Sequence, residues 1–368
     1  MSDVPHLRFP EFSGEWEKYT IGDLCEEFKS GKNIKAESIQ EEGVYPVFGG
    51  NGLRGYTDRY NHDGDYVLIG RQGALCGNVR FVTGKTYITE HAIAAKATND
   101  NYTRYLEYLF VRLNLGQFSD QSAQPGLAVN KLLKIETYVP SKAEQLKIAF
   151  LLRLLDERIA TQNKIIEDLK KLKSAIIEIE YSPKDSYHSH IGGAIVQISK
   201  RNKDNHLCNV LSVSNRQGFI KQSEQFEDRN VASDDTSNYK IVEKNDFAYN
   251  PARINVGSIA RLTKFETGIV SPMYICFRTK DCLLPEYLEL FFESRNFFYH
   301  IQKRLEGSVR LCLSYEELCN IPIVIPSIEK QKQVDLHLSK LAQKIDLEMK
   351  ILQFVQQQKT YLLHQMFI

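Results

Sequence analysis

The glycines of residues 45–56, YPVFGGNGLRGY, have the spacing of two cofactor-binding motifs. Gly50, Gly52 and Gly55 fit G-x-G-x-x-G, the loop that binds the pyrophosphate of a dinucleotide. Phe48, Gly50 and Gly52 fit F-x-G-x-G, the loop that many methyltransferases wrap around S-adenosylmethionine. In either motif a buried strand leads into the loop and a helix begins within it, so that the helix N-terminus faces the ligand.

The flanking sequence does not predict those two elements. The strand before the loop is short and contains Pro46, and the segment after Gly55, YTDRYNHDGDYVLIGRQG, has no 3.6-residue apolar stripe. A methyltransferase would also need an N/D-P-P-Y/F catalytic loop. The nearest match, Asn250-Pro251-Ala252-Arg253, lacks the aromatic residue that stacks on the target base. We therefore favour a tight turn whose glycines allow positive φ or a close backbone approach to a partner.

Irregular segments of both halves of the chain carry Arg, Asn and Gln, whose forked hydrogen bonds suit base edges and phosphates. Neighbouring glycines let the backbone come close to a phosphate. The candidate DNA-binding residues are Gly50, Asn51, Gly52, Arg54, Arg71, Gln72 and Gln124 in the first half, and Asn215, Arg216, Gln217, Asn250, Arg253, Asn255 and Arg310 in the second.

Composition is that of an ordinary globular protein with two or three domains. The chain has 368 residues, 42% of them hydrophobic and 25% charged, and no run of 18 apolar residues. The N-terminus lacks the layout of a signal peptide, so we expect a cytoplasmic protein. The net charge of +1 argues against a uniformly basic DNA binder. It leaves open a binder with clustered charge, or a protein–protein scaffold whose globular parts bind peptides.

Cysteine and histidine spacing predicts no metal site. Seven cysteines occur without a C-x-x-C pair, and nine histidines without an H-E-x-x-H motif. His188 and His190 lie two residues apart in what looks like a linker. We therefore expect neither a disulfide framework nor a bound metal, and no catalytic residue emerges from these side chains.

An internal repeat gives the elements that must position the candidate residues. Residues 138–141, YVPS, align with residues 324–327, VIPS, at an offset of 186 positions. Gln145 aligns with Gln331 in the same frame, and about 40 residues align without a gap. Upstream, the strand-like YVLIG and the amphipathic YLEYLF at 105–110 have counterparts in FAY and in YLELFF at 287–292.

Each copy ends in a long predicted helix. Pro140-Ser141 and Pro326-Ser327 supply a breaker and an N-cap, and Ser182-Pro183 ends the first helix after roughly 60 Å. Apolar residues recur in alternating steps of three and four, as in a coiled coil. They are Leu152, Leu155, Ile159, Ile166, Leu169 and Ile176 in the first copy, and Leu338, Leu341, Ile345, Leu352, Val355 and Leu362 in the second. Both copies are polar at two equivalent seam positions, Gln162 and Lys173 in the first and Glu348 and Lys359 in the second.

These patterns predict an α+β protein with two similar globular α/β parts, each followed by a long helix. The predicted boundaries are 1–140, 141–182, 183–326 and 327–368. We expect the two helices to pair as an antiparallel coiled coil that relates the halves by a pseudo-two-fold axis. Such a spacer would set a fixed distance between two sites on duplex DNA.

The ordered set of motifs resembles the specificity subunit of a type I restriction–modification system over essentially the whole chain. The resemblance rests on WEKYTIGD (16–23), the YPVFGGNGLRGY stretch, LSVSNRQGFI (211–220), NDFAYNPARINVG (245–257) and the two P-S…Q helices. It implies two target recognition domains, the first reading the 5′ half and the second the 3′ half of a split DNA sequence. The second part has no G-x-G stretch, so no residue there can be matched to Gly50–Gly55.

The resemblance also implies partners and cofactors. The helices would be the platform for two modification subunits, which carry S-adenosylmethionine and methylate a flipped adenine at N6. Restriction subunits would use ATP and Mg to translocate and cut DNA. This chain would hold no cofactor and no catalytic residue. A self-contained DNA adenine methyltransferase and a protein–protein scaffold without DNA stay open as alternatives.

Overall fold

The computed structural model describes residues 4–119, 126–182, 189–215, 217–225, 235–307 and 311–368. Its internal contacts divide the chain into two compact units. Unit 1 comprises Met1–Lys164 with Lys350–Ile368, and unit 2 comprises Ile165–Met349. This division cuts through both long helices, so the four-part division at 140, 182 and 326 stays an interpretation of the sequence.

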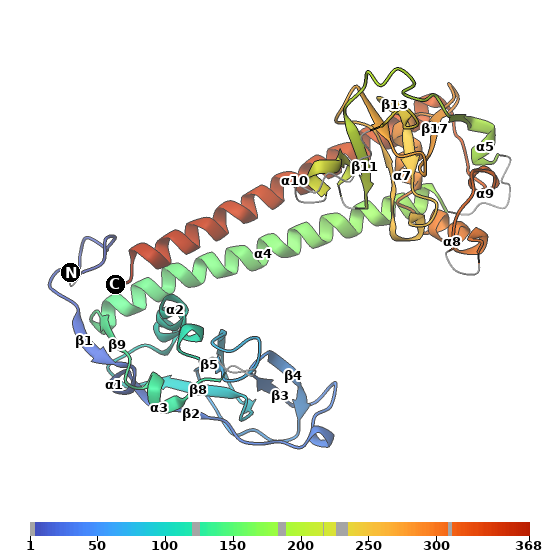
Figure 1. The fold of residues 1–368 in the computed structure, drawn as a ribbon. Coiled ribbons are helices and arrows are strands. Elements are labelled where there is room, and N and C mark those ends of the chain that lie inside the picture. The colour runs from blue at the N-terminus through green and yellow to red at the C-terminus, as the bar shows by residue number, and fades with distance from the viewer. Residues whose placement is uncertain (1–3, 120–125, 183–188, 216, 226–234, 308–310) are drawn as a thin grey trace. The chain divides into compact units, whose positions relative to one another are not determined.

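Unit 1 contains three sheets (Figure 1). The largest is antiparallel, in the order β2 (Cys25–Ser30), β8 (Ala92–Ala97), β5 (Tyr66–Gly70) and β6 (Val79–Val82). The second has the order β4 (Gly52–Thr57), β3 (Tyr45–Gly49) and β7 (Tyr87–Ile88), in which β3 and β7 are parallel. The third pairs β1 (Glu17–Thr20) with β9 (Glu136–Val139).

Short helices complete unit 1, and α2 covers the largest sheet. They are α1 (Ile21–Leu24), η1 (Ala36–Ser38), α2 (Thr103–Leu113), η2 (Leu115–Phe118) and α3 (Val129–Leu132). Tyr105, Leu106 and Leu109 repeat at helical spacing on the buried face of α2 and join the core of the unit. The amphipathic helix expected at 105–110 is therefore confirmed.

Unit 2 is built on two four-stranded sheets. One has the order β10 (Ile195–Ile198), β17 (Ile275–Thr279), β14 (Phe247–Tyr249) and β15 (Ile259–Arg261). The other has the order β12 (Gly218–Lys221), β11 (Val210–Ser214), β16 (Thr267–Val270) and β13 (Lys240–Glu243). Its short helices are α5 (Ile191–Ala194), α6 (Gln222–Gln225), η3 (Ile254–Val256), α7 (Pro285–Phe291), α8 (Arg295–Arg304) and α9 (Tyr315–Cys319).

The two units share one topology, which confirms the internal repeat. The β2–β8–β5–β6 sheet corresponds strand for strand to β10–β17–β14–β15. In the other sheet, an antiparallel hairpin has a parallel neighbour in both units, β3–β4 beside β7 and β11–β12 beside β16. In unit 1 the place of β13 is taken by an isolated antiparallel bridge between His62 and Thr86. The hairpins β3–β4 and β11–β12 are therefore equivalent, although their sequences show no common motif.

The two long helices run without a break where the sequence predicts them. They are α4 (Lys142–Glu180) and α10 (Ile328–Gln365), green and red in Figure 1. The twelve apolar seam residues are all buried or half-buried, whereas most residues between them are exposed. No helix among the described residues is both long enough and apolar enough to span a membrane.

Each unit by itself shows how the helices pair. In unit 1, Leu152 and Leu155 of α4 share a core with Val355 and Leu363 from the second half of α10. In unit 2, Ile177 near the end of α4 shares a core with residues from the first turns of α10. The beginning of each helix therefore packs against the end of the other. The antiparallel coiled coil is confirmed, and the pseudo-two-fold relation between the halves stays a prediction.

The lysines of the seam attach the helices to the globular parts. Lys359 of α10 forms an ion pair with Asp156 of α4, and Asp156 also accepts a hydrogen bond from the Tyr108 hydroxyl at 2.8 Å. Lys173 of α4 forms an ion pair with Glu293, which follows α7, at 2.6 Å. Both seam lysines therefore form ion pairs with acidic residues that are remote in sequence.

A buried glutamine fixes the start of each long helix to its globular part. The Gln145 side chain accepts from the backbone amide of Tyr102, the N-cap of α2, at 3.0 Å, and donates to Pro140 O at 3.0 Å. Gln331 likewise accepts from the amide of Leu284, the N-cap of α7, at 2.7 Å. It donates to Pro326 O at 2.8 Å. These two glutamines are the pair that the 186-residue repeat aligns, and neither N-cap residue has a side-chain cap of its own.

We expect Gln145→Leu and Gln331→Leu each to lower the free energy of unfolding by at least about 2 kcal/mol, because a helix-start amide and a proline carbonyl would lose their buried partner. Gln357→Leu, on the exposed face of α10, is the matched control and should change stability by less than about 0.5 kcal/mol. Urea denaturation of the three variants measures the difference. Equal stability of all three would contradict the proposed role of the two buried glutamines.

Candidate nucleic-acid interface

The glycine-rich stretch of unit 1 is the turn of the β3–β4 hairpin. Gly49 pairs with Gly52, and a strand rather than a helix follows the turn. A Cβ at Gly50 would lie 2.7 Å from His91 O, and a Cβ at Gly70 would lie 2.8 Å from Gly50 O. The turn therefore packs backbone to backbone on the end of β5, and this close approach requires the glycines. The strand–loop–helix arrangement of a cofactor site is not formed here.

Three arginines surround this hairpin turn. The Arg80 guanidinium lies 3.1–3.4 Å from the position of a Cβ on Gly52, and Arg54 Cδ lies 2.8 Å from that of a Cβ on Gly49. Arg71 follows β5, and its backbone amide donates to His91 O at 2.9 Å. None of the three side chains forms an ion pair or a hydrogen bond with the described residues. The cluster is thus positive and free to bind an anion such as a phosphate.

Further polar side chains lie on the same surface. Gln72 Oε1 lies 3.2 Å from His91 Nδ1, and His91 Nε2 lies 3.4 Å from a carboxylate oxygen of Glu90. The other Glu90 oxygen, Oε2, is buried and has no hydrogen-bond partner among the residues that the structure describes. Asn51 is exposed at the turn. Of the candidates predicted in this half, Gln124 lies outside the described residues.

Unit 2 brings together the corresponding segments. The turn of the β11–β12 hairpin carries Asn215 and Gln217, both exposed, and Arg216 lies outside the described residues. The Asn215 Cβ lies 3.7 Å from the position of a Cβ on Gly257, in the loop between β14 and β15. Ser258 Oγ of this loop donates to Val213 O at 3.2 Å. As in unit 1, the hairpin turn therefore packs on the loop that links the two strands equivalent to β5 and β6.

The β14–β15 loop is held by its own hydrogen bonds. Asn250 Oδ1 accepts from the Ala252 amide at 3.1 Å, and the Ser258 amide donates to Arg253 O at 3.1 Å. The Asn250 NH₂ group makes no hydrogen bond with the described residues and could donate to a ligand. Arg253 and Asn255 are exposed, and their side chains contact no polar partner among the described residues. Arg310, the last candidate, lies outside those residues.

A hollow beside Asn215 differs in charge from the arginine cluster of unit 1. It is lined by Arg261, Glu289 and Glu293, among others. Arg261 forms ion pairs with Glu286 and Glu289, the latter through Nε at 2.9 Å. Burial raises the pKa of Glu289, although the neighbouring Arg261 acts in the opposite direction. Because the two glutamates already compensate the positive charge of Arg261, this hollow is a poor site for a phosphate.

We call these two sets of polar residues the tip surfaces; all of them are exposed except Arg71, which is half-buried. The tip surface of unit 1 consists of Asn51, Arg54, Arg71, Gln72 and Arg80, and that of unit 2 consists of Asn215, Gln217, Arg253 and Asn255. Each lies where a hairpin turn meets the next loop of the same unit, so the structure gathers most of the predicted residues at equivalent places. Which of them contact DNA stays a prediction.

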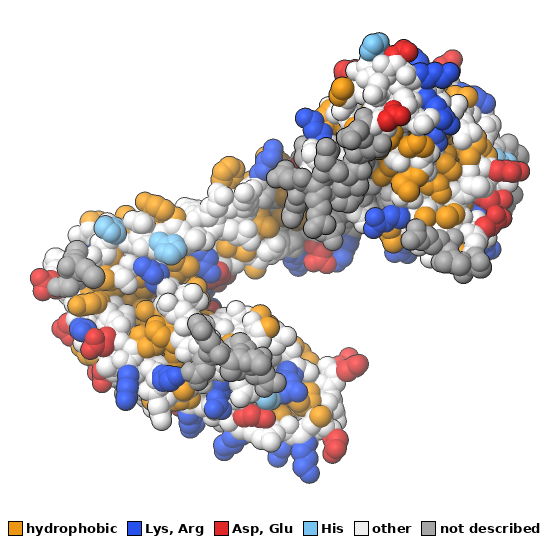
Figure 2. Space-filling model, in the orientation of Figure 1, with side chains coloured by type: hydrophobic (Ala, Val, Ile, Leu, Met, Phe, Trp, Pro, Cys, Tyr) orange, Lys and Arg blue, Asp and Glu red, His pale blue; other side chains and the backbone are white. Residues whose placement is uncertain are grey.

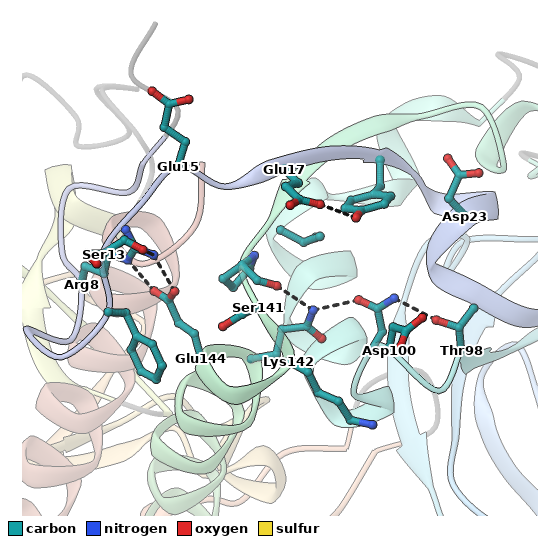
Figure 3. Close-up of a pocket in the computed structure, with 16 residues that line it drawn as sticks. Arg8, Ser13, Glu15, Glu17, Asp23, Thr98, Asp100, Ser141, Lys142 and Glu144 are labelled. Atoms are coloured by element: carbon teal, nitrogen blue, oxygen red, sulfur yellow. Dashed lines mark hydrogen bonds and ion pairs between the residues drawn. The ribbon is translucent and has the colours of Figure 1, made fainter.

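A second polar pocket of unit 1 lies beside the start of α4 (Figure 3). Arg8 donates through Nε and a terminal nitrogen to the two oxygens of buried Glu144, both at 2.8 Å. Thr20 donates to Asp23 through its hydroxyl and its amide, and these bonds hold the pKa of Asp23 below its usual range. We interpret this pocket as part of the joint between the N-terminal segment and α4, because its central charges are paired.

Comparison with known proteins agrees with this arrangement. Residues 13–171 match the family model described as type I restriction modification DNA specificity domain. The specificity subunit of the type I restriction enzyme EcoprrI from Escherichia coli is 39% identical over 186 residues, which are 48% of this chain and 45% of that protein. A putative type I specificity subunit of Mycoplasma genitalium is 26% identical over 181 residues, 48% of this chain and 47% of that protein.

Residues 13–171 are therefore similar to the DNA specificity domain of type I restriction–modification systems. The chain matches about half the length of these curated relatives. A solved type I specificity subunit from M. genitalium has the same fold over 99% of both chains, with a TM-score of 0.67 and 18% identity. A structure described for the assembly and conformational transition of a type I system covers 96% of this chain and 97% of its own, with a TM-score of 0.57 and 12% identity.

Sequence reasoning missed two residues beside the hairpin turn of unit 1, Arg80 and His91. Arg80 stands on β6 opposite Leu68 of β5, and only the strand pairing brings it to the turn at Gly52. His91 is placed there by the backbone contacts of Gly50 and Arg71. No short motif marks either residue. The equivalence of the hairpins β3–β4 and β11–β12 would have indicated this surface. That equivalence can be recognised only from the order of strands in the sheets.

We expect Arg80→Gln to weaken binding to duplex DNA and to lower the slope of log affinity against log salt by about one, since one phosphate contact would be lost. Arg59→Gln is the matched control. Arg59 is also exposed in unit 1, but it lies over the Tyr87 ring, 5.6 Å from its centroid. Fluorescence anisotropy over a salt series measures both variants. Identical slopes for Arg80→Gln and Arg59→Gln would show that the cluster does not bind phosphate.

Proposed function

We propose that this chain is a non-catalytic DNA-binding subunit that reads a split target, one half-site with each unit. The observation that carries the proposal is the duplicated juxtaposition of hairpin turn and loop. The first tip surface has three arginines that pair with no polar group in the described part of the chain, and the second has an exposed Arg253 and Asn255 on a loop held by its own hydrogen bonds. Equivalent places with different side chains suit two recognition domains that read unlike sequences.

Several features favour recognition over catalysis. The glycine stretch forms a hairpin that packs on its own unit, so a helix N-terminus does not face it. The Asn250-Pro251-Ala252-Arg253 segment has no aromatic residue for base stacking, and Asn250 Oδ1 is bonded within its own turn. S-adenosylmethionine would thus belong to partner modification subunits, and ATP and Mg to restriction subunits. This geometry supports the recognition subunit over a self-contained methyltransferase.

The long helices offer a surface for those partners. Within unit 1, Leu146, Phe150 and Leu154 recur every fourth residue on α4 and are 43–53% exposed. Phe354 and Tyr361 stand one heptad apart on α10 and are 68% and 61% exposed. Figure 2 shows hydrophobic side chains on the exposed surface of the helices. Apolar stripes of this kind favour helix packing by another protein, and we propose two modification subunits as the occupants. The complex would act on DNA in the cytoplasm.

Mapping N6-methyladenine in cells that express this chain with its modification partners tests the proposal. We expect a two-part sequence with a fixed gap, because two units at a set distance read one duplex. Replacing residues 1–140 with the equivalent part of a relative is the matched variant, and it should change only one half of the sequence. A contiguous methylated sequence, or a change in both halves after the replacement, would contradict the proposal.

A further inference from the structure

Helix α8 of unit 2 has one exposed face that the proposed function does not use. Ser294 caps the helix by accepting from the Phe297 amide at 3.2 Å, and Phe297 and Ile301 are buried in the core of the unit. The residues of the opposite face recur at the spacing of an α-helix. They are Arg295, Phe298, Tyr299, Gln302 and Lys303, all exposed. These side chains include two cations, two aromatic rings and an amide, and at the start of the helix the Glu178 carboxylate accepts from the Arg295 amide at 2.9 Å.

The positive charges of this face are available. Neither Arg295 nor Lys303 forms an ion pair with the described residues, and Lys303 Nζ lies over the Tyr299 ring, 4.3 Å from its centroid. Arg304 behaves differently, because its Nε lies 3.7 Å from Glu317. Burial lowers the pKa of His300, and Arg304 and Lys303 lower it further, as expected where positive charge accumulates.

The aromatic rings of this face are exposed side by side. Phe298 is 42% and Tyr299 is 52% exposed. The 186-residue offset places α8 on the end of α2 and on η2, where Phe298, Tyr299 and Lys303 align with Arg112, Leu113 and Gln117. The pair of aromatic rings is therefore a feature of unit 2 that the repeat does not share.

Helix α8 adjoins the second tip surface. It packs against η3, the short helix that carries Asn255, and Ile301 and Ile254 lie in one core cluster. After α8 the chain returns to the same loop, where the Leu313 amide donates to Pro251 O at 3.1 Å. Val256, beside Asn255, is 52% exposed. The α8 face thus extends a surface that already holds Arg253 and Asn255.

We propose that the exposed face of α8 is a second DNA-contacting element of unit 2, and that it binds the same duplex as the β14–β15 loop. Lys303 and Arg295 contact phosphates, which attract cations regardless of sequence. Phe298 and Tyr299 contact the apolar parts of the duplex, such as thymine methyls and sugars. The charge of the face and its continuity with the tip surface select duplex DNA as the occupant. The inference rests on the proposed function.

The test uses the full chain assembled with its modification partners and a labelled duplex that carries the mapped two-part sequence. Lys303→Gln should lower the slope of log affinity against log salt by about one. It should weaken binding to the mapped duplex and to a scrambled duplex equally. Tyr299→Ala should weaken binding several-fold, and Tyr299→Phe should restore it because the ring is kept. Lys340→Gln on the exposed face of α10 is the charge-matched control and should bind like the unmodified chain.

Arg253→Ala separates failure of this inference from failure of the proposed function. If Arg253→Ala weakens binding to the mapped duplex while Lys303→Gln and Tyr299→Ala equal Lys340→Gln, the α8 proposal is overturned and the function stands. If the unmodified complex shows no salt-dependent DNA binding, the proposed function itself fails. Loss of subunit assembly by Tyr299→Ala, with unchanged DNA affinity of the complex that does form, would make the face a protein contact and overturn the proposal.

Discussion

The buried hydrogen bonds of Gln145 and Gln331 are the contacts on which the architecture depends. Each glutamine joins the first turn of a long helix to the N-terminus of the helix that covers the main sheet of its unit. Because each glutamine side chain is almost fully buried, breaking these hydrogen bonds would leave unsatisfied amide and carbonyl groups in the core. A globular part therefore cannot turn freely about the helix that follows it, and its tip surface keeps a defined direction.

The two units share the glutamine contacts at the start of the long helices, whereas the side chains of their tip surfaces differ. Burial explains the difference, since a side chain enclosed in the core must match its neighbours and an exposed turn is constrained only by its backbone. The unit 1 turn uses glycines to pack on Gly70, while the equivalent turn of unit 2 exposes Asn215 and Gln217. One scaffold can thus carry two unlike contact surfaces. A shared glutamine contact combined with different tip surfaces suits the proposed reading of two different half-sites.

The long helices and the repeat could be predicted from sequence because their signals are periodic and share one frame over many residues. The equivalence of β3–β4 and β11–β12 could not be predicted, because turn residues leave no common pattern and the match lies in the sheet order. Arg80 was missed for a related reason, since strand pairing rather than sequence distance brings it to Gly52. The sequence placed Lys173 and Lys359 on the helix seam, but their ion pairs with Glu293 and Asp156 could not be predicted because those partners are remote in sequence.

The measurement that tests the central claim most directly is a methylation map after one heptad is inserted into both helices, following Lys164 and Lys350. These positions are aligned by the repeat, and a whole heptad preserves the coiled-coil seam. The account predicts that both half-sites stay the same while the gap between them grows by about three base pairs, given 1.5 Å per helical residue and 3.4 Å per base pair. An unchanged gap in an active complex, or altered half-sites, would contradict it.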